Sequence, residues 1–293
     1  NAFATAADTT TGDTITFILG TVIPKATNPS PANGATNVPG SPAPTLTWTG
    51  GAGATIHKVH FGTTNPPPFV GDQETTSFTP GAPLAPNTTY YWRIDESDGS
   101  ATTVGDVWSF TTASEPLQIV AWRSVRSTSC GNQAITLDPS GVTTEPRLGG
   151  LRRIEVEFNR PIIPIDNPIL SGSDGSFPMF IDGDASGTLL WLEYPPLANG
   201  VCYTLDLATV VIAEDDGSQL SGSTACTIRN LYGDVNNNGV VNLGDALLIK
   251  AKVGQAVSAS TAAFDLDLSC GNIELSDALA AKAAIGASAT CAP

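Results

Sequence analysis

Oxygen-bearing side chains between Asp234 and Asp245 have the types and the spacing of a calcium-binding loop. They stand at loop positions 1, 3, 5, 9 and 12, and position 6 is a glycine. Calcium takes roughly six to eight oxygen ligands in a flexible shell, and the glycine permits the sharp turn between ligand groups. Because the residues that follow, 246–249, are apolar, we expect the last ligand to lie at the start of a helix.

A second, imperfect copy of the loop follows, with one extra residue, Cys270, inserted ahead of its glycine. An alanine-rich stretch, 278–285, again predicts a helix after the loop. Two loop–helix units about thirty residues apart form an internal repeat, which is much harder to obtain by chance than one loop. The repeated positions are Asp265, Asp267, Ser269, Gly271 and Asp277.

Roughly the last sixty residues resemble the dockerin type I family. The resemblance is carried by two segments, GDVNNNGVVNLGDALLIKAKVG and FDLDLSCGNIELSDALAAKAAIG. The resemblance implies two calcium ions and a cohesin-like partner. For the first ion it implies the side chains of Asp234, Asn236, Asn238 and Asp245, the carbonyl of Val240, and Asn242 through a water molecule. For the second ion it implies Asp265, Asp267, Ser269 and Asp277. The alternative for each loop is a polar turn before a helix, without metal.

The positions that would recognise a cohesin depart from the family pattern. Dockerins that bind cohesins usually carry small hydroxyl residues at loop positions 10 and 11. This chain has Leu243 and Gly244 in the first loop, and Leu275 and Ser276 in the second. The change leaves the predicted calcium ligands in place but puts recognition of a cohesin in doubt.

The rest of the chain predicts β-structure. Short runs of Val, Ile, Thr and aromatic residues between frequent Pro and Gly turns are typical of all-β sandwiches. We therefore expect a mainly β protein with two β-sandwich domains, followed by a small α-helical calcium-binding module. The expected boundaries are an N-terminal extension at 1–27, a first sandwich at 28–114, a second at 115–230 and the dockerin-like module at 231–293.

The first sandwich has a predicted tyrosine corner, in which the Tyr90 hydroxyl bonds to the backbone a few residues upstream. With this corner and the segments 91–94 and 107–110, the region resembles bacterial fibronectin type III-like domains. Trp48, Trp92 and Trp108 either fill the sandwich core or line a sugar-binding face. The second sandwich resembles bacterial immunoglobulin-like modules loosely. Its arginines predict a solvated strand face paired to Glu155 and Glu157, and the alternative is a patch that binds an acidic partner; these are Arg147, Arg152, Arg153 and Arg160.

The N-terminal extension contains a strand that belongs to neither sandwich. Residues 1–12 are rich in Ala and Thr and are expected to be mobile, whereas residues 14–24 predict a strand. An apolar strand must find a sheet edge, and adding a strand to a neighbouring subunit is a known mode of assembly. A head-to-tail contact of this kind does not close and would build a fibre. The candidate assembly residues are Ile15, Phe17, Leu19 and Val22.

Five cysteines and a start at Asn1 rather than methionine favour an exported protein in an oxidising compartment. We expect Cys202 to pair with Cys226, and Cys270 with Cys291, which leaves Cys130 over. Because sequence cannot fix connectivity, these pairings are hypotheses.

Several function classes are poorly supported. The formal net charge is −15 and no segment is basic, so nucleic acid is not an expected partner. The sequence contains no run of eighteen apolar residues, so it does not predict a membrane-spanning helix. The two histidines, His57 and His60, point to opposite faces of one expected strand and cannot hold a metal together. No catalytic motif is present, so we expect no enzyme activity and no catalytic residues.

We therefore predict a secreted, non-catalytic assembly protein at the cell surface or outside the cell, joined to copies of itself in a fibre. The alternatives are a cohesin-docking subunit of a polysaccharide-degrading complex, and a carbohydrate-binding module with polysaccharide as its partner. Chelation of calcium is expected to unfold the last sixty or so residues and to leave both sandwiches folded.

Overall fold

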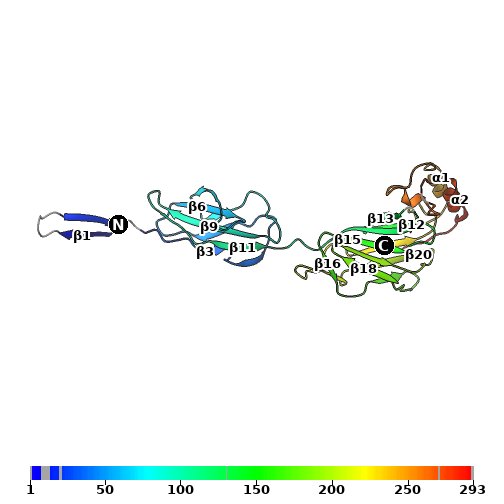
Figure 1. Cartoon of the computed structure of the whole chain (residues 1–293), viewed down its shortest axis with the longest axis horizontal. Helices are drawn as coiled ribbons and strands as arrows, with labels where there is room; N and C mark the ends of the chain where they lie inside the picture. Colours follow the sequence, from blue (N-terminus) through cyan, green and yellow to red (C-terminus); the bar gives the residue numbers. More distant parts are fainter. Residues whose placement is uncertain (1, 8–13, 20–21, 130, 270, 292–293) are drawn as a thin grey trace. The chain divides into compact units, whose positions relative to one another are not determined.

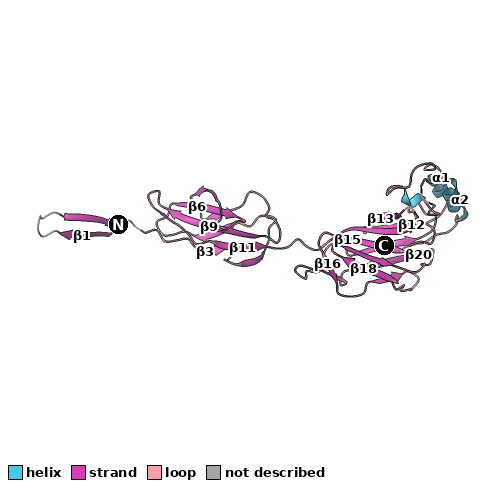
Figure 2. Cartoon of the chain, viewed as in Figure 1, coloured by secondary structure: helices cyan, strands magenta, loops and turns pink. Residues whose placement is uncertain are grey.

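The computed structural model describes the backbone of residues 2–7, 14–19, 22–129, 131–269 and 271–291, and side chains from residue 22 onward. The protein is mainly β, and the described helices lie near the C-terminal end (Figure 2), as predicted. It divides into two compact units, residues 1–115 and 116–293 (Figure 1). None of the helices in the described ranges has the length and apolar character needed to span a membrane.

The N-terminal extension forms a two-stranded antiparallel hairpin. Strand β1 (Ala2–Ala7) pairs with β2 (Thr14–Leu19), with Ala2 opposite Leu19 and Ala7 opposite Thr14. The predicted strand is therefore present but shorter than expected. Residues 2–7, expected to be mobile, form its partner. Of the candidate assembly residues, Ile15, Phe17 and Leu19 lie in β2, and Val22 lies beyond it and is exposed.

The first unit contains a β-sandwich. One sheet has the order β3-β5-β8, formed by Thr27–Ser30, Leu46–Thr49 and Ser77–Phe78. The other has the order β4-β11-β9-β6-β7, formed by Ala35–Val38, Trp108–Thr112, Thr89–Ser97, Ile56–Gly62 and Phe69–Gln73. A short strand, β10 (Thr102–Thr103), also pairs with β9.

The core of this sandwich is aromatic. Trp48, Trp92 and Trp108 are all buried, and Trp92 packs edge-on against both of the other rings. The rings therefore present no face to a sugar, and the sugar-binding alternative for these tryptophans is wrong. The predicted tyrosine corner is present, because the Tyr90 hydroxyl accepts a hydrogen bond of 3.0 Å from the Ala85 amide.

The second unit contains a larger sandwich. One sheet has the order β13-β12-β15-β19-β18, formed by Gly131–Leu137, Ile119–Thr128, Arg153–Phe158, Leu189–Glu193 and Asp182–Ser186. The other has the order β14-β22-β20-β17, formed by Val142–Glu145, Ala225–Asn230, Val201–Asp206 and Ile169–Gly172. A small ribbon joins β16 (Ile162–Pro164) to β21 (Val211–Ala213).

The buried faces of these sheets meet in one hydrophobic core that includes Trp122, Val156 and Tyr203. Tyr203 forms a second tyrosine corner, because its hydroxyl accepts a hydrogen bond of 3.0 Å from the Ala198 amide. The interval of five residues is the same as between Tyr90 and Ala85. This corner was not predicted from the sequence.

The arginines of the second sandwich do not form one solvated face. Arg153 pairs with Glu155 as predicted, at 2.7 Å. Glu157 is paired instead with Arg123, at 2.6 Å. Arg147 contradicts the prediction, because it is completely buried in a two-pronged ion pair with Glu145, with N–O distances of 2.6 and 2.7 Å.

The C-terminal module, residues 231–291, has two α-helices and a short 3-10 helix. These are α1 (Leu243–Lys250), η1 (Ala262–Phe264) and α2 (Leu275–Ala283). A small core packs the two α-helices together through Ile249, Leu266, Ile273 and Ala281. The module belongs to the same compact unit as the second sandwich.

A disulfide between Cys202 and Cys291 ties the end of the chain to β20. The two predicted pairings are therefore wrong. Cys226 lies opposite Leu205 in the β20–β22 ladder, three residues along from Cys202, and its thiol is free and buried in the core. Because successive side chains point to opposite faces of a sheet, Cys202 faces away from that core, where the C-terminal tail reaches it. Cys130 and Cys270 lie outside the described residues.

Candidate calcium sites

The first loop wraps its own backbone around two buried carboxylates. Asp234 accepts hydrogen bonds from the amides of Asn238 and Gly239, at 3.1 and 3.0 Å. Asp245 accepts from the amides of Asn236 and Asn242, at 3.2 and 2.9 Å. Both carboxylates are fully buried. The loop therefore brings its first and last predicted ligands to the inside of the same turn.

The amide side chains of the first loop also point along this turn. Asn236 and Asn238 each accept a bond from the backbone amide two residues on, at 3.0 and 2.9 Å. Asn242 caps helix α1 by accepting from the Gly244 amide at 2.7 Å, and its own side-chain amide lies 3.4 Å from the Val240 carbonyl. Gly239 has a φ of 85°, which supports the predicted need for glycine at this position.

The second loop repeats this geometry despite its extra residue. Asp277 accepts from the amides of Asp267 and Glu274 at 3.2 and 2.8 Å, as Asp245 does in the first loop. Asp267 accepts from the Ser269 amide at 2.9 Å, as Asn236 does from Asn238. The insertion at position 270 therefore leaves the backbone cradle of the last carboxylate unchanged. Sequence reasoning passed over Glu274, although it stands at the position of Asn242.

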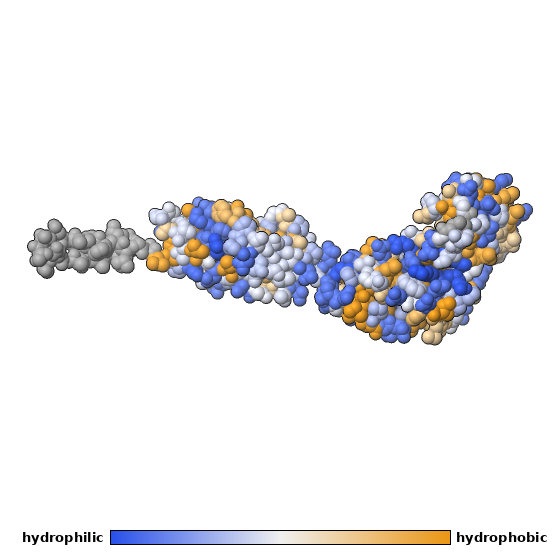
Figure 3. Space-filling model, in the orientation of Figure 1, coloured by the Kyte–Doolittle hydropathy of each residue, from blue (hydrophilic) through white to orange (hydrophobic). Residues whose placement is uncertain are grey.

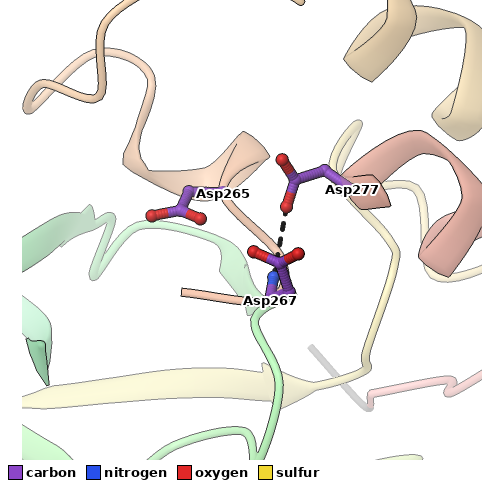
Figure 4. Close-up of side chains that lie close together, drawn as sticks. All are labelled: Asp265, Asp267 and Asp277. Atoms are coloured by element: carbon purple, nitrogen blue, oxygen red, sulfur yellow. Dashed lines mark hydrogen bonds between the residues drawn. The ribbon is translucent and has the colours of Figure 1, made fainter. Parts of the chain in front are cut away.

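Three carboxylates converge in the second loop (Figure 4). One oxygen each from Asp265, Asp267 and Asp277 lies within 4.8 Å of the others. One oxygen of Asp265, Oδ1, is buried and has no hydrogen-bond partner among the described residues. A buried anionic oxygen without a partner is costly, and a bound cation would satisfy it. This oxygen and an all-oxygen donor set fit calcium better than a metal that prefers nitrogen or sulfur.

Burial, hydrogen bonds and neighbouring negative charges together shift the pKa values of this cluster. Burial raises the pKa of Asp277, and the charges of Asp267 and Asp265 raise it further. Burial would also raise the pKa of Asp267, but hydrogen bonds from Ser269 and Ser276 outweigh it and lower that pKa below its ordinary value. A divalent cation would relieve the repulsion that these groups share.

Both loops rest on the second sandwich. Asp234 is contacted by Thr144 of β14 at 2.9 Å and by Arg229 of β22 at 3.4 Å. Asp265 accepts a bond of 2.8 Å from the side chain of Gln133 in β13. Sequence reasoning missed these three residues, since they lie between about 5 and 130 positions away in sequence and carry no motif. The sandwich therefore positions the first carboxylate of each loop.

Comparison with protein-family models identifies two module types. Residues 232–286 match the dockerin type I domain, and residues 20–112 match a bacterial Ig-like domain. The dockerin-like prediction for the end of the chain is thereby confirmed. The first sandwich, which resembles fibronectin type III-like domains in sequence, matches an Ig-like model, and the two types share the sandwich architecture. Each match covers less than half of the chain.

Solved structures give only distant likenesses. A BSP domain of a biofilm associated protein is similar at 16% identity, with a TM-score of 0.22. The alignment covers 70% of this chain and 30% of that one. A two-domain fibronectin type III segment from chicken tenascin has 14% identity and a TM-score of 0.30, over 70% of this chain and 97% of that one. Likenesses this weak carry no functional argument. No curated protein matches the chain.

The matched modules set the broad character of the protein. Dockerin type I domains bind calcium and cohesins in general. Dockerin and bacterial Ig-like domains are typical of extracellular or cell-surface proteins, and both are non-catalytic module types.

Proposed function

We propose that this protein is a non-catalytic assembly protein outside the cell or on its surface, which docks a cohesin-type partner through the helices of its C-terminal module. One observation carries the proposal. The two helices expose leucines at matching positions of the repeat, on the side that does not enter the module's core.

The exposed leucines come in two equivalent pairs. Leu243 and Leu247 of α1 are 57% and 54% exposed, and Leu275 and Leu279 of α2 are both 56% exposed. Each pair is spaced by four residues, which places its members on one face of the helix. Hydrophobic residues are visible on the surface of this end of the chain in Figure 3. Exposed apolar residues gathered on one face are typical of a protein–protein interface.

The substitution at loop position 10 therefore changes the chemistry of the expected interface and does not remove it. Leu243 and Leu275 offer apolar contacts where hydroxyl groups would offer hydrogen bonds. We infer that the partner presents a complementary apolar surface, so the module would select a subset of cohesins.

Two calcium ions would hold this surface in shape. In the first loop the proposed ligands are Asp234, Asn236, Asn238, Val240, Asn242 and Asp245. In the second they are Asp265, Asp267, Ser269 and Asp277. Each last ligand also accepts the backbone amide at the start of a helix, so the ions would fix the helix ends that carry Leu243 and Leu275.

The docking proposal is tested by isothermal titration calorimetry of the full chain against a panel of type I cohesins, with calcium and with EGTA. We expect calcium-dependent binding to at least one cohesin. The double variant Leu243→Asp/Leu275→Asp should weaken this binding at least about 100-fold, because charges would enter the apolar interface. Val120→Asp is the matched control, since Val120 is 62% exposed on β12 of the sandwich. Equal losses in both variants would count against the helical face.

A second candidate function is self-assembly through the N-terminal hairpin. The hairpin is a sheet of two strands, and no other strand of the described residues pairs with it. An isolated hairpin is marginally stable in water, so further pairing along β1 or β2 would stabilise it. The test is electron microscopy of the purified protein with and without residues 1–26. Fibres that form equally well without these residues would exclude the hairpin as the joint.

A further inference from the structure

The two calcium loops differ in the charges that surround them. The first loop contains two carboxylates, Asp234 and Asp245, and has asparagine at position 3. The second contains four, Asp265, Asp267, Glu274 and Asp277, because position 3 is an aspartate and position 9 a glutamate, and the three aspartates cluster. The sandwich adds to this difference by placing a cation beside the first loop.

Arg229 is that cation. Its Nη1 lies 3.4 Å from Asp234 Oδ2, 3.2 Å from the Asn237 carbonyl and 3.0 Å from the Thr144 hydroxyl. Its Nε donates to the Ala289 carbonyl at 3.1 Å. The guanidinium is mostly buried, and a Cβ atom on Gly239 would lie 3.2 Å from its central carbon. These contacts hold the positive charge against the first loop.

The strands around Arg229 fix its position. Arg229 stands opposite Thr144 in the β14–β22 ladder and opposite Cys202 in the β20–β22 ladder. The three residues form a row across the outer face of the sheet, and the disulfide to Cys291 holds the C-terminal tail over that row. Ala289 in this tail also donates its amide to the Gly239 carbonyl at 3.0 Å. Arg229 is therefore enclosed between sheet, loop and tail.

In the described part of the chain, no cation pairs with the carboxylates of the second loop. Among the described ion pairs, none includes Asp265, Asp267 or Asp277. The sandwich contributes the neutral side chain of Gln133, which donates a hydrogen bond to Oδ2 of Asp265. The other oxygen, buried and unpartnered within the described part of the chain, points to a missing positive charge. The net charge around the second loop is thus more negative than around the first by three units, which come from Asp267 at position 3, Glu274 at position 9 and the Arg229 beside the first loop.

We propose that the second, imperfect loop is the tighter calcium site. In the first loop, Arg229 partly neutralises the negative charge of Asp234 and thereby lowers the calcium affinity of that loop. The inference rests on the proposed calcium sites and concerns their order of filling. Calcium affinity in such loops rises with the number of ligand charges. A positive charge about 6 Å from a divalent ion costs at least about tenfold in affinity, even in a medium with the dielectric constant of water. The first loop would keep its fold at calcium concentrations that empty it, because Arg229 bonds to Asp234 in place of the ion.

The experiment is a calcium titration of the full disulfide-bonded chain, measured by isothermal titration calorimetry. The protein is first freed of calcium with a chelator. The wild-type protein should bind two ions in steps at least about tenfold apart in Kd. Asp265→Ala should abolish the tighter step, and Asp234→Ala the weaker one. The opposite assignment, or two equal steps, would overturn the inference and leave the calcium proposal intact. No calcium binding by the wild-type chain would overturn both.

Charge variants separate the effect of Arg229 on calcium affinity from the effect of the position-3 residues. Arg229→Met should tighten only the weaker step, by about tenfold, whereas Arg229→Lys, which keeps the charge, should leave both steps close to wild type. Asn236→Asp and Asp267→Asn exchange the position-3 residues of the loops and should bring the two Kd values closer together. Circular dichroism of each variant checks its fold. If Arg229→Met does not fold, the position-3 exchange decides, and Kd values that stay as far apart as in the wild-type protein contradict the inference.

Discussion

Glu145 and Arg147 form an ion pair that is closed off from water on both sides. The Glu145 carboxylate also accepts from the Ser124 hydroxyl, and Arg147 donates to the carbonyls of Gln133 and Ser124 at 2.9 and 3.1 Å. Neither side chain is exposed. Such a pair contributes little net stability, but the loss of one partner leaves a charge buried alone.

We therefore expect Glu145→Gln to lower the free energy of unfolding of the second unit by roughly 3–5 kcal/mol, because Arg147 would keep its charge without a counter-ion. Urea denaturation followed by tryptophan fluorescence measures the change. Arg123→Gln is the control, since it breaks the partly exposed pair with Glu157 and should cost less than about 1 kcal/mol. A small effect of both changes would mean that water reaches the Glu145 site.

Cys226 is a buried thiol whose reactivity the fold suppresses. Burial, with a smaller contribution from the charge of Asp138, raises the pKa of Cys226 to about 12. Because only the thiolate reacts readily with alkylating agents, Cys226 should stay unmodified by iodoacetamide at pH 8 in the native protein and react fully in guanidinium. Peptide mapping by mass spectrometry measures this at Cys226 itself. Rapid labelling of the native protein would contradict its placement in the core.

The raised pKa of Cys226 makes the stability of the folded state depend on pH in one direction. The pKa of Cys226 is higher in the folded state than its ordinary value of 9.0, so the folded state holds the proton more tightly. This contribution to stability is fully present below pH 9 and is lost as the pH rises toward about 12. Cys226→Ala should flatten the pH dependence in that window, which urea titrations at several pH values would detect.

At the scale of elements, each sandwich is fastened by a tyrosine corner. Tyr90→Phe and Tyr203→Phe should each cost about 1–3 kcal/mol, because the amides of Ala85 and Ala198 lose their acceptor. Tyr194→Phe is the matched control. The Tyr194 hydroxyl is buried without a hydrogen-bond partner in the described ranges, so its removal should be neutral or stabilising. Thermal melts of the three variants compare these effects, and equal losses would contradict the role of the corners.

The elements that the sequence predicts well depend on local patterns. The calcium loops follow from fixed spacing of oxygen ligands, and the first corner follows from the interval between Leu84 and Tyr90. The second corner has the same interval between Leu197 and Tyr203, so a search for that spacing would have found it. Trp48 alternates with polar neighbours in β5, and this pattern favours a core position over a sugar platform.

The remaining features depend on contacts between distant segments. The disulfide joins residues 89 positions apart, and no local pattern relates Cys202 to Cys291. The contacts of Arg229, Thr144 and Gln133 with the calcium loops arise only when the module packs against the sandwich. Sequence periodicity places each strand but does not say which outer face a following module will cover.

At the scale of the whole molecule, the second sandwich and the C-terminal module form one compact unit. Backbone bonds from Gly233 to Pro146 and from Leu148 to Leu266, at 2.9 and 2.7 Å, reinforce the side-chain contacts. Such shared contacts couple the stability of two parts of a chain. The sequence-based expectation that chelation spares both sandwiches therefore needs revision for the second one.

We expect EGTA to lower the melting temperature of residues 116–291 as a single transition and to leave the transition of the first unit unchanged. A ligand that binds only the folded state stabilises everything that folds with it, by about 2.7 kcal/mol at a concentration 100 times Kd. Differential scanning calorimetry of the full chain resolves the two units. A separate low-temperature transition of the module, with the second sandwich unmoved, would contradict this coupling.

The bond between Cys202 and Cys291 also has a mechanical consequence. The C-terminal module is covalently attached to the sandwich at two points, through the chain after Asn230 and through the disulfide. These attachments end on β22 and β20, which pair with each other, and Arg229 lies opposite Cys202 in their ladder. A partner that pulls on the helices of the module therefore loads two neighbouring strands at once. The tension would then be divided between two strands that are hydrogen-bonded to each other.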